Sequence, residues 1–173
     1  LNCTTTYVLL EQERWFEREL SFLLDWLKPG MNAVDIGANV GVYSLAMARC
    51  VSPGGSVFAF EPGSENRRNL EVGRSANRIR NLCISASAVA ESDRTGWLRI
   101  MDSGDLNTLV EGTEPQIGAE PVEVKSIDTL EHEQHWPSID FLKVDAEGQE
   151  RNIILGGRRF LEQQSPLLMF EMR

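Results

Sequence analysis

The stretch Val34-Asp35-Ile36-Gly37-Ala38-Asn39-Val40-Gly41 decides the predicted fold of this 173-residue chain. Residues 33–36 have the apolar character of a buried strand, and residues 40–49 have that of an apolar helix. A glycine turn between a strand and a helix is where α/β sheets bind ligands, because the glycines admit a ligand and the helix start offers N–H groups. The same turn also occurs without a ligand, so the motif alone leaves a binding site and a tight turn as alternatives.

Strand and helix patterns alternate through most of the chain. Further strands are predicted at residues 57–61, 82–86, 139–145 and 167–171, and further helices at 11–27, 64–77 and 149–163. This alternation is typical of a parallel sheet with helices on both faces. We expect the strand order 3-2-1-4-5, with the strand around Val34 in the middle and the ligand crevice at the C-terminal tips of the first and fourth strands.

The middle of the chain has a different pattern. Residues 97–100 and 122–125 alternate apolar and polar side chains, which predicts an inserted antiparallel hairpin. Residues 102–121 are rich in Gly, Asp, Glu and Pro and are expected to form a long surface loop. We expect one α/β domain over residues 1–173, with residues 1–30 as a helical lead-in.

Composition limits the classes of partner. Hydrophobic residues make up 42% and charged residues 25%, as in ordinary globular domains, and no apolar run approaches the ~20 residues of a membrane-spanning helix. The net charge of −9 makes nucleic acid a poor partner, because phosphate binding needs surplus Lys and Arg. The one basic cluster is predicted to be a solvated helix face: Arg67, Arg68, Arg74, Arg78 and Arg80.

Cysteine usage indicates a reducing compartment. Cys3, Cys50 and Cys83 are widely spaced and form no CxxC pair, so neither a disulfide framework nor a zinc site is expected. A cytoplasmic location follows as the expectation, and the oligomeric state stays open.

Glu61 and the glycine spacing indicate which nucleotide the crevice would take. Glu61 ends the second strand, twenty-four residues after Gly37, where an acidic side chain accepts hydrogen bonds from ribose hydroxyls. The alternative is a merely solvated carboxylate. A dinucleotide fingerprint needs G-x-G-x-x-G, but Asn39 and Val42 occupy the second and third glycine positions. The spacing suits a nucleoside without a pyrophosphate, such as S-adenosylmethionine, and disfavours a nicotinamide-dependent oxidoreductase. A catalytically silent nucleoside-binding module is a second rival.

A second group of polar residues follows the fourth strand. Asp145 falls at the strand tip, Glu147 lies just beyond it, and Lys143 shares the face of Asp145 by strand alternation. A lysine inside an apolar strand needs a partner, so one interpretation is a core-stiffening ion pair. The other interpretation places both carboxylates at the crevice mouth, where one of them orients or deprotonates an acceptor hydroxyl.

Several motifs together resemble the FkbM-type methyltransferases. They lie at residues 34–41, 60–62, 126–130, 139–148, 155–157 and 166–171, so the resemblance covers about residues 30–171. It implies a Rossmann-like class I methyltransferase fold and S-adenosylmethionine as methyl donor, with S-adenosylhomocysteine as product. It also implies O-methylation of a small molecule or sugar. Because that fold continues past its fifth strand with a helix and two more strands, we expect the chain to be C-terminally incomplete.

The resemblance also implies roles by position. Asp35, Gly37, Asn39 and Gly41 would hold the amino-acid end of the cofactor, Glu61 its ribose, and Ser87 and Ala88 its adenine. With their neighbours, the predicted cofactor-binding set is Asp35, Gly37, Ala38, Asn39, Gly41, Glu61, Pro62, Ser87 and Ala88, and the predicted catalytic set is Asp145, Glu147 and Lys143.

Metal binding is possible but not favoured. His132 and His135 are three residues apart in a polar stretch, where a surface loop or helix end is more common than a ligand pair. Asp145, Glu147 and Glu171 lie near the tips of two strands and offer the oxygen ligands that Mg²⁺ takes.

Overall fold

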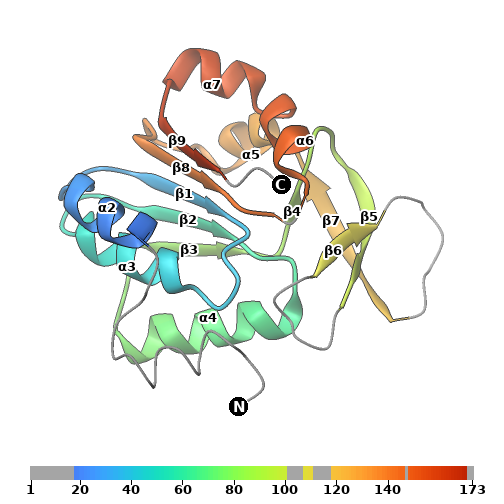
Figure 1. Ribbon diagram of the computed structural model, residues 1–173, viewed down its shortest axis with the longest axis horizontal. Helices are drawn as coiled ribbons and strands as arrows, with labels where there is room; N and C mark the ends of the chain where they lie inside the picture. Colours follow the sequence, from blue (N-terminus) through green and yellow to red (C-terminus); the bar gives the residue numbers. More distant parts are fainter. Residues whose placement is uncertain (1–17, 101–106, 111–117, 147, 171–173) are drawn as a thin grey trace.

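The computed structural model describes residues 18–100, 107–110, 118–146 and 148–170. Its main sheet has five parallel strands in the order β3-β2-β1-β8-β9, which confirms the predicted order with the Val34 strand in the middle. Figure 1 shows this sheet at the centre of the molecule with helices on either side. The strands are β1 Ala33–Ile36, β2 Val57–Phe60, β3 Leu82–Ser85, β8 Phe141–Val144 and β9 Leu167–Phe170.

Helices cover both faces of the main sheet because successive strand residues point to opposite sides. Ala33 and Phe141 pack with side chains of α2 Arg18–Trp26, α3 Val42–Cys50 and α4 Ser64–Ala76. Val34, Ile36 and Phe60 pack on the other face with side chains of α5 Ile127–Gln134, α6 Glu150–Leu155 and α7 Arg158–Gln164. All four residues of β1 and of β8 are buried, as expected of strands in the middle of a doubly covered sheet.

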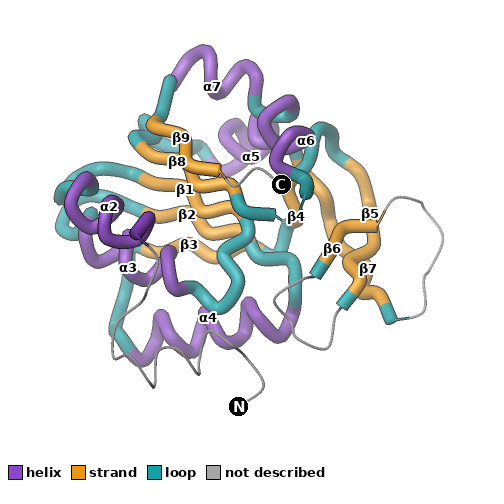
Figure 2. The backbone as a smooth tube through the Cα atoms, viewed as in Figure 1, coloured by secondary structure: helices purple, strands orange, loops and turns teal. Residues whose placement is uncertain are grey.

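The inserted hairpin is part of a second, mixed sheet of order β4-β7-β5-β6. Its strands are β4 Ala88–Val89, β5 Arg94–Arg99, β6 Thr108–Val110 and β7 Ala119–Lys125. β5 pairs antiparallel with β6 and β7, whereas β4 pairs parallel with β7. Figure 2 shows this sheet beside the C-terminal ends of β1, β2 and β8. The expected loop at 102–121 was therefore partly wrong, because Thr108–Val110 and Ala119–Pro121 are strand; residues 101–106 and 111–117 lie outside the described residues.

The helix predicted at 149–163 is two helices, so that expectation was wrong. α6 ends at Leu155 and α7 begins at Arg158, with Gly156 and Gly157 between them. The chain is crowded at this break, since a Cβ on Gly156 would lie 2.3 Å from the carbonyl oxygen of Ala90. Two adjacent glycines also lower helix propensity, so the backbone turns here and passes close to β4.

Helix α5 was not foreseen. The Ser126 side chain accepts a hydrogen bond from the Thr129 N–H and caps its first turn. Of the predicted helix at 11–27, the described part is α2, Arg18–Trp26.

Across the described ranges, no helix has the length and apolar character needed to cross a bilayer.

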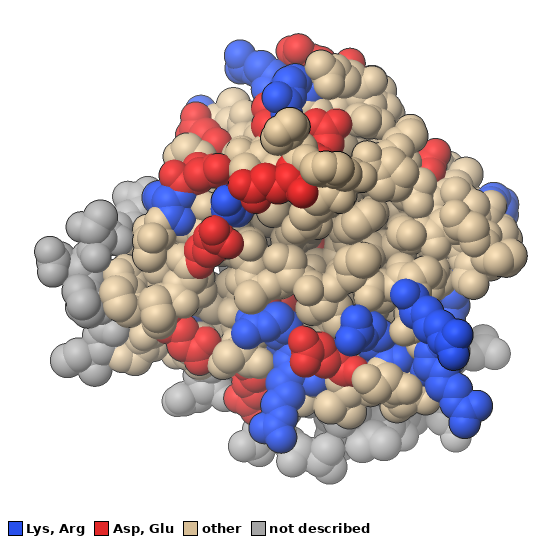
Figure 3. All heavy atoms as spheres, turned by 180° about the vertical axis from the view of Figure 1, so that it is seen from behind, with Lys and Arg blue, Asp and Glu red and all other residues tan. Residues whose placement is uncertain are grey.

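The basic cluster lies on and after α4. Figure 3, a view from behind, shows Lys and Arg side chains gathered over the lower part of the molecule, where Figure 1 places α4. Arg68, Arg78 and Arg80 are exposed, which agrees with a solvated face. Arg67 instead donates to the backbone carbonyls of Glu61 and Pro62, at 3.0 and 2.8 Å, and so supports the turn after β2.

Candidate functional site

The turn after β1 folds back against β2. The N–H groups of Gly37 and Ala38 both donate to the carbonyl of Phe60, each at 3.0 Å. Gly37, Asn39 and Gly41 all have positive φ, at 79°, 52° and 95°. This backbone path suits glycine at two positions and asparagine at the third, since asparagine tolerates the left-handed region better than most residues. The motif that dominates the sequence therefore forms a tight loop that leads into α3.

Glu61 closes this loop from the neighbouring strand. Its Oε2 accepts from the Asn39 N–H and its Oε1 accepts from the Gly63 N–H, both at 2.8 Å. Burial raises the pKa of this carboxyl; the two backbone N–H groups and the Arg67 guanidinium oppose the rise, and the Asp35 carboxylate adds to it. A nearly buried acid thus joins the tip of β2 to the turn after β1.

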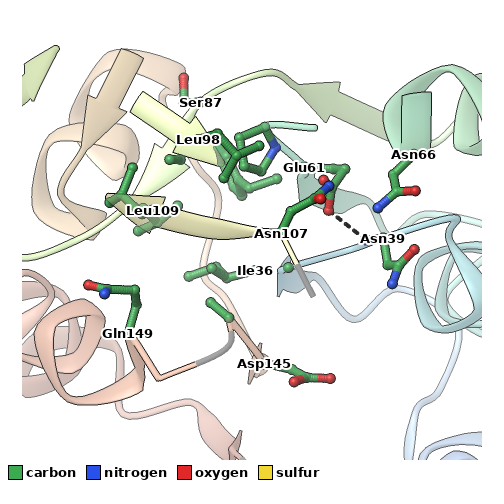
Figure 4. A pocket seen from close by; sticks show the side chains of 16 residues that line it. Ile36, Asn39, Glu61, Asn66, Ser87, Leu98, Asn107, Leu109, Asp145 and Gln149 are labelled. Carbon is green, nitrogen blue, oxygen red and sulfur yellow. Dashed lines mark hydrogen bonds between the residues drawn. The ribbon is translucent and has the colours of Figure 1, made fainter. Parts of the chain in front are cut away.

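A pocket opens at this junction, where the strand order reverses between β1 and β8. It contains about 720 Å³ of empty space, a figure that includes its open mouth. Figure 4 shows Asn39, Asn66 and Asp145 toward one side and Ser87, Leu109 and Gln149 toward the other. Its lining residues are Ile36, Gly37, Asn39, Phe60, Glu61, Pro62, Asn66, Ser87, Ala88, Val89, Leu98, Asn107, Leu109, Asp145, Ala146 and Gln149.

Seven of the residues predicted from sequence meet at this pocket. Gly37 and Asn39 come from the turn after β1, Glu61 and Pro62 from the end of β2, Ser87 from the connection after β3, Ala88 from the start of β4, and Asp145 from the end of β8. Five others do not line it: Asp35 and Lys143 are buried in β1 and β8, Ala38 and Gly41 lie in the turn after β1, and Glu147 lies outside the described residues.

Asp35 and Lys143 form a buried ion pair across the β1–β8 junction. Asp35 is fully buried, and its Oδ1 lies 3.5 Å from the Lys143 Nζ. Its Oδ2 accepts from the Ser44 hydroxyl at 2.5 Å, on the first turns of α3. Lys143 Nζ also lies 3.2 Å from Asp145 Oδ2 and 4.7 Å from the centre of the Tyr43 ring. The lysine therefore joins a buried carboxylate to one at the pocket.

The electrostatic balance keeps Lys143 charged. Burial lowers the pKa of its ammonium, but the carboxylates of Asp35 and Asp145 outweigh this effect, so the pKa lies above its ordinary value. The Asp145 side chain is 41% exposed, in contrast to the buried Asp35. The Asp145 carboxylate is therefore held by Lys143 and is also open to solvent.

The chain after Asp145 is held by Glu150. Its Oε1 accepts from the N–H groups of Ala146 and Gly148, both at 3.1 Å. Gln149 in this segment lines the pocket, and its Oε1 accepts from the Asn152 amide at 3.0 Å. An acidic residue in the first turn of α6 therefore orders one wall of the pocket.

Several lining residues were not identified from sequence. Leu98, Asn107 and Leu109 come from the inserted hairpin, Asn66 from α4 and Gln149 from the start of α6. Gln149 follows the Asp145 motif closely enough that its proximity could have been suspected. No sequence pattern around the hairpin residues indicates a binding site, because only the tertiary fold brings them to the pocket.

The metal candidates take different places. His132 lies in the last turn of α5 and His135 caps its C-terminus, with Nδ1 2.8 Å from the His132 carbonyl oxygen. Glu147 and Glu171 of the proposed Mg²⁺ set lie outside the described residues. Among the residues that are described, no three His, Cys, Asp or Glu side chains come together as metal ligands would.

Comparison with known proteins gives one family. Residues 35–173 match the profile of the methyltransferase FkbM domain. No curated protein sequence matches the chain significantly.

Two solved structures share the fold. The methyltransferase FkbM from Methylobacillus flagellatus KT is 17% identical, with a TM-score of 0.58 over 88% of this chain and 40% of that protein. An rRNA methylase from Streptococcus thermophilus is 13% identical, with a TM-score of 0.52 over 87% of this chain and 64% of that protein. The chain therefore spans less than two thirds of either protein. At these identities the likeness concerns the fold, which is the Rossmann-like fold of methyltransferases.

Proposed function

Because this chain belongs to the FkbM methyltransferase family, we propose that its pocket binds S-adenosylmethionine and that the protein methylates a hydroxyl oxygen of a small molecule or sugar. The observation that carries the proposal is the position of Glu61. This acid lies at the pocket, beside the turn after β1, at the tip of β2. In sheets of this kind, an acid at that point hydrogen-bonds ribose hydroxyls.

The pocket lining fits the other parts of the proposed cofactor. Ser87, Ala88 and Val89 line the pocket together with Leu98 and Leu109 of the hairpin, and this mostly apolar set suits an adenine ring. At the other side, the polar groups of Asn39 and Asp145 suit the amino-acid end. When bound, S-adenosylmethionine supplies an electrophilic methyl group on a sulfonium. The chain itself supplies orientation and a site partly shielded from water.

We propose that Asp35 and Lys143 act on the site through their neighbours. Asp35 is fully buried and bonds Ser44, so it fixes the first turns of α3 against β1. Lys143 holds Asp145 at 3.2 Å and so fixes the carboxylate of a residue that lines the pocket. Neither side chain needs to touch the cofactor for these roles.

Asp145 is the residue proposed to position the acceptor hydroxyl and to receive its proton during methyl transfer. Its backbone N–H donates to the Ile36 carbonyl at 3.0 Å, so the tip of β8 is fixed to β1. A side chain on such a fixed strand tip is better suited to orient a substrate than one on a free loop. Glu147 is the second candidate for this role by its place in the sequence.

The two alternative functions predict different ligand binding and turnover. A nicotinamide-dependent oxidoreductase would bind NAD, yet Asn39 and Val42 stand where the dinucleotide fingerprint has glycine. A silent nucleoside-binding module would bind S-adenosylhomocysteine without any turnover. No metal is required for the proposed chemistry, and nucleic acid is not the proposed acceptor.

Two measurements test the proposal. Titration calorimetry with S-adenosylmethionine, S-adenosylhomocysteine and NAD should show binding of the first two alone. A screen for transfer of a radiolabelled methyl group to hydroxylated small molecules and sugars should find an acceptor. Binding of NAD in place of S-adenosylhomocysteine would overturn the cofactor assignment, and cofactor binding without transfer to any acceptor class would favour the silent module.

A further inference from the structure

The inserted β5–β6 hairpin forms one wall of the pocket. Leu98 of β5 pairs with Leu109 of β6, and both side chains line the pocket together with Asn107. The sheet is also fixed to the main body, because Glu120 of β7 accepts from the Ser64 hydroxyl at 2.7 Å at the start of α4. Ser64 follows closely after Glu61, so this contact fixes the hairpin sheet next to the proposed ribose site.

Asn107 approaches Glu61 closely. An ideal Cβ built on Gly63 would lie 2.8 Å from the Asn107 Nδ2 and 2.8 Å from the Glu61 Oε1. The two polar groups therefore converge on the same small volume, which only a glycine at position 63 leaves open. Figure 4 shows the Asn107 side chain reaching from the hairpin toward Glu61.

The hydrogen-bonding capacity of Glu61 leaves a role for a second residue. Each of its carboxylate oxygens already accepts one backbone N–H, from Asn39 and from Gly63. An ionised carboxylate can accept from ribose hydroxyls but cannot donate to them. A vicinal diol has two donors and two acceptors, so a complete site needs a donor as well, and a carboxamide supplies both a donor and an acceptor.

We propose that Asn107 is a specificity residue that recognises the ribose diol of the cofactor together with Glu61. This inference rests on the proposed function, since it assigns a residue to the same nucleoside site. The inserted hairpin then contributes directly to the cofactor site, and Asn107 is its residue that hydrogen-bonds the ribose.

The test uses the full chain with S-adenosylhomocysteine and its 2′-deoxy and 3′-deoxy analogues. Wild type should bind the parent compound and discriminate against both analogues. Asn107→Ala should weaken binding of the parent roughly 3–10-fold, the loss of one neutral hydrogen bond. The same variant should also lose the discrimination against one of the two analogues. A structural role would weaken all three ligands equally, so the change in discrimination is the informative readout.

Two variants serve as controls. Asn69→Ala removes an exposed asparagine of α4 that does not line the pocket, and it should behave as wild type. Asn107→Ser retains a donor and acceptor, so it should recover part of the discrimination. If wild type binds S-adenosylhomocysteine and Asn107→Ala discriminates between the analogues as wild type does, the inference is overturned while the proposed function stands. If folded wild type binds no S-adenosylhomocysteine, the proposed function itself fails and the inference fails with it.

Discussion

The carbonyl oxygen of Asp145 lies against Gly37 so closely that a Cβ on Gly37 would come within 1.8 Å of it. This contact brings the ends of β1 and β8 together at the point where the strand order reverses. No side chain fits between the two backbones, and the positive φ of Gly37, 79°, also favours glycine. The floor of the pocket therefore depends on one glycine.

Gly37→Ala should destabilise the protein strongly, because the new methyl group meets backbone atoms that cannot rotate away. Gly30→Ala is the matched control, since Gly30 has a φ of 91° but nothing within 4 Å of an added Cβ. The free energy of unfolding of the control should fall only by the cost of placing alanine in the left-handed region, about 1–2 kcal/mol. In urea denaturation, Gly37→Ala should lose at least about 2 kcal/mol more than the control. Equal losses would show that the close contact with Asp145 is not present.

Lys143→Met should destabilise the fold because it leaves the fully buried Asp35 without its cation. Removing one partner of a buried pair costs about 3–5 kcal/mol. Replacing Asp35 by Asn in the same protein should recover part of the loss, and a double-mutant cycle measures the coupling.

The control for this prediction is Lys125→Met. Lys125 lies 3.0 and 3.5 Å from Glu133 and Glu123, but these partners are exposed to solvent. Its loss should leave the midpoint of denaturation nearly unchanged, since exposed pairs contribute little.

Because the pKa of Lys143 is raised above 10.5, the contribution of this lysine to stability should hold through neutral pH and decline only as the pH rises through that elevated value. A decline near neutral pH would contradict the assigned environment.

Glu61 predicts a pH dependence of the opposite kind to that of a salt-bridged acid. Its folded-state pKa lies above the ordinary 4.5, so its contribution to stability is fully present below pH 4.5 and is lost as the pH rises through the elevated folded value. The free energy of unfolding of wild type should therefore fall relative to that of Glu61→Gln as the pH increases from about 4.5 toward neutral. Urea denaturation of both proteins over this range checks the sign. A difference that is constant, or that grows in favour of wild type, would show that Glu61 is not desolvated.

Asp145→Asn preserves shape and removes charge at the proposed acceptor site. Turnover with an acceptor found in the transfer screen should fall by roughly 10²–10⁴-fold, the usual contribution of a positioned base. Binding of S-adenosylhomocysteine should stay within about tenfold, or 1.4 kcal/mol. Asp140→Asn is the control, because Asp140 precedes the opposite end of β8 and accepts from the Asn32 N–H. Normal turnover in Asp145→Asn would move the proposed role to Glu147.

The sequence was sufficient to predict the main sheet and seven of the sixteen residues that line the pocket, for physical reasons. The strands at Val34 and at Leu142 are continuously apolar because both faces are covered, and a glycine turn between a strand and a helix is typical of α/β sheets. Glu61 stood out as an acid at the end of an otherwise apolar strand. The break at Gly156 was missed because the apolar pattern continues across it, and the crowding against Ala90 depends on the tertiary fold.

The hairpin wall could not be predicted for a related reason. Leu98 and Leu109 look like ordinary apolar residues of a half-exposed strand, and their approach to the pocket depends on how one sheet packs beside another. Asn107 lies in a polar stretch that composition alone assigns to a surface loop. Contacts between residues this far apart in sequence leave no periodic trace in either segment.

We propose above all that the pocket at the ends of β1, β2 and β8 is the S-adenosylmethionine site. A crystal structure of the chain grown with S-adenosylhomocysteine tests it most directly. We predict density with the ribose at Glu61, the adenine between Ala88 and Leu109, and the amino-acid end toward Asn39 and Asp145. Density for the ligand anywhere else in the molecule, or a ligand-free pocket at saturating concentration, would contradict the account.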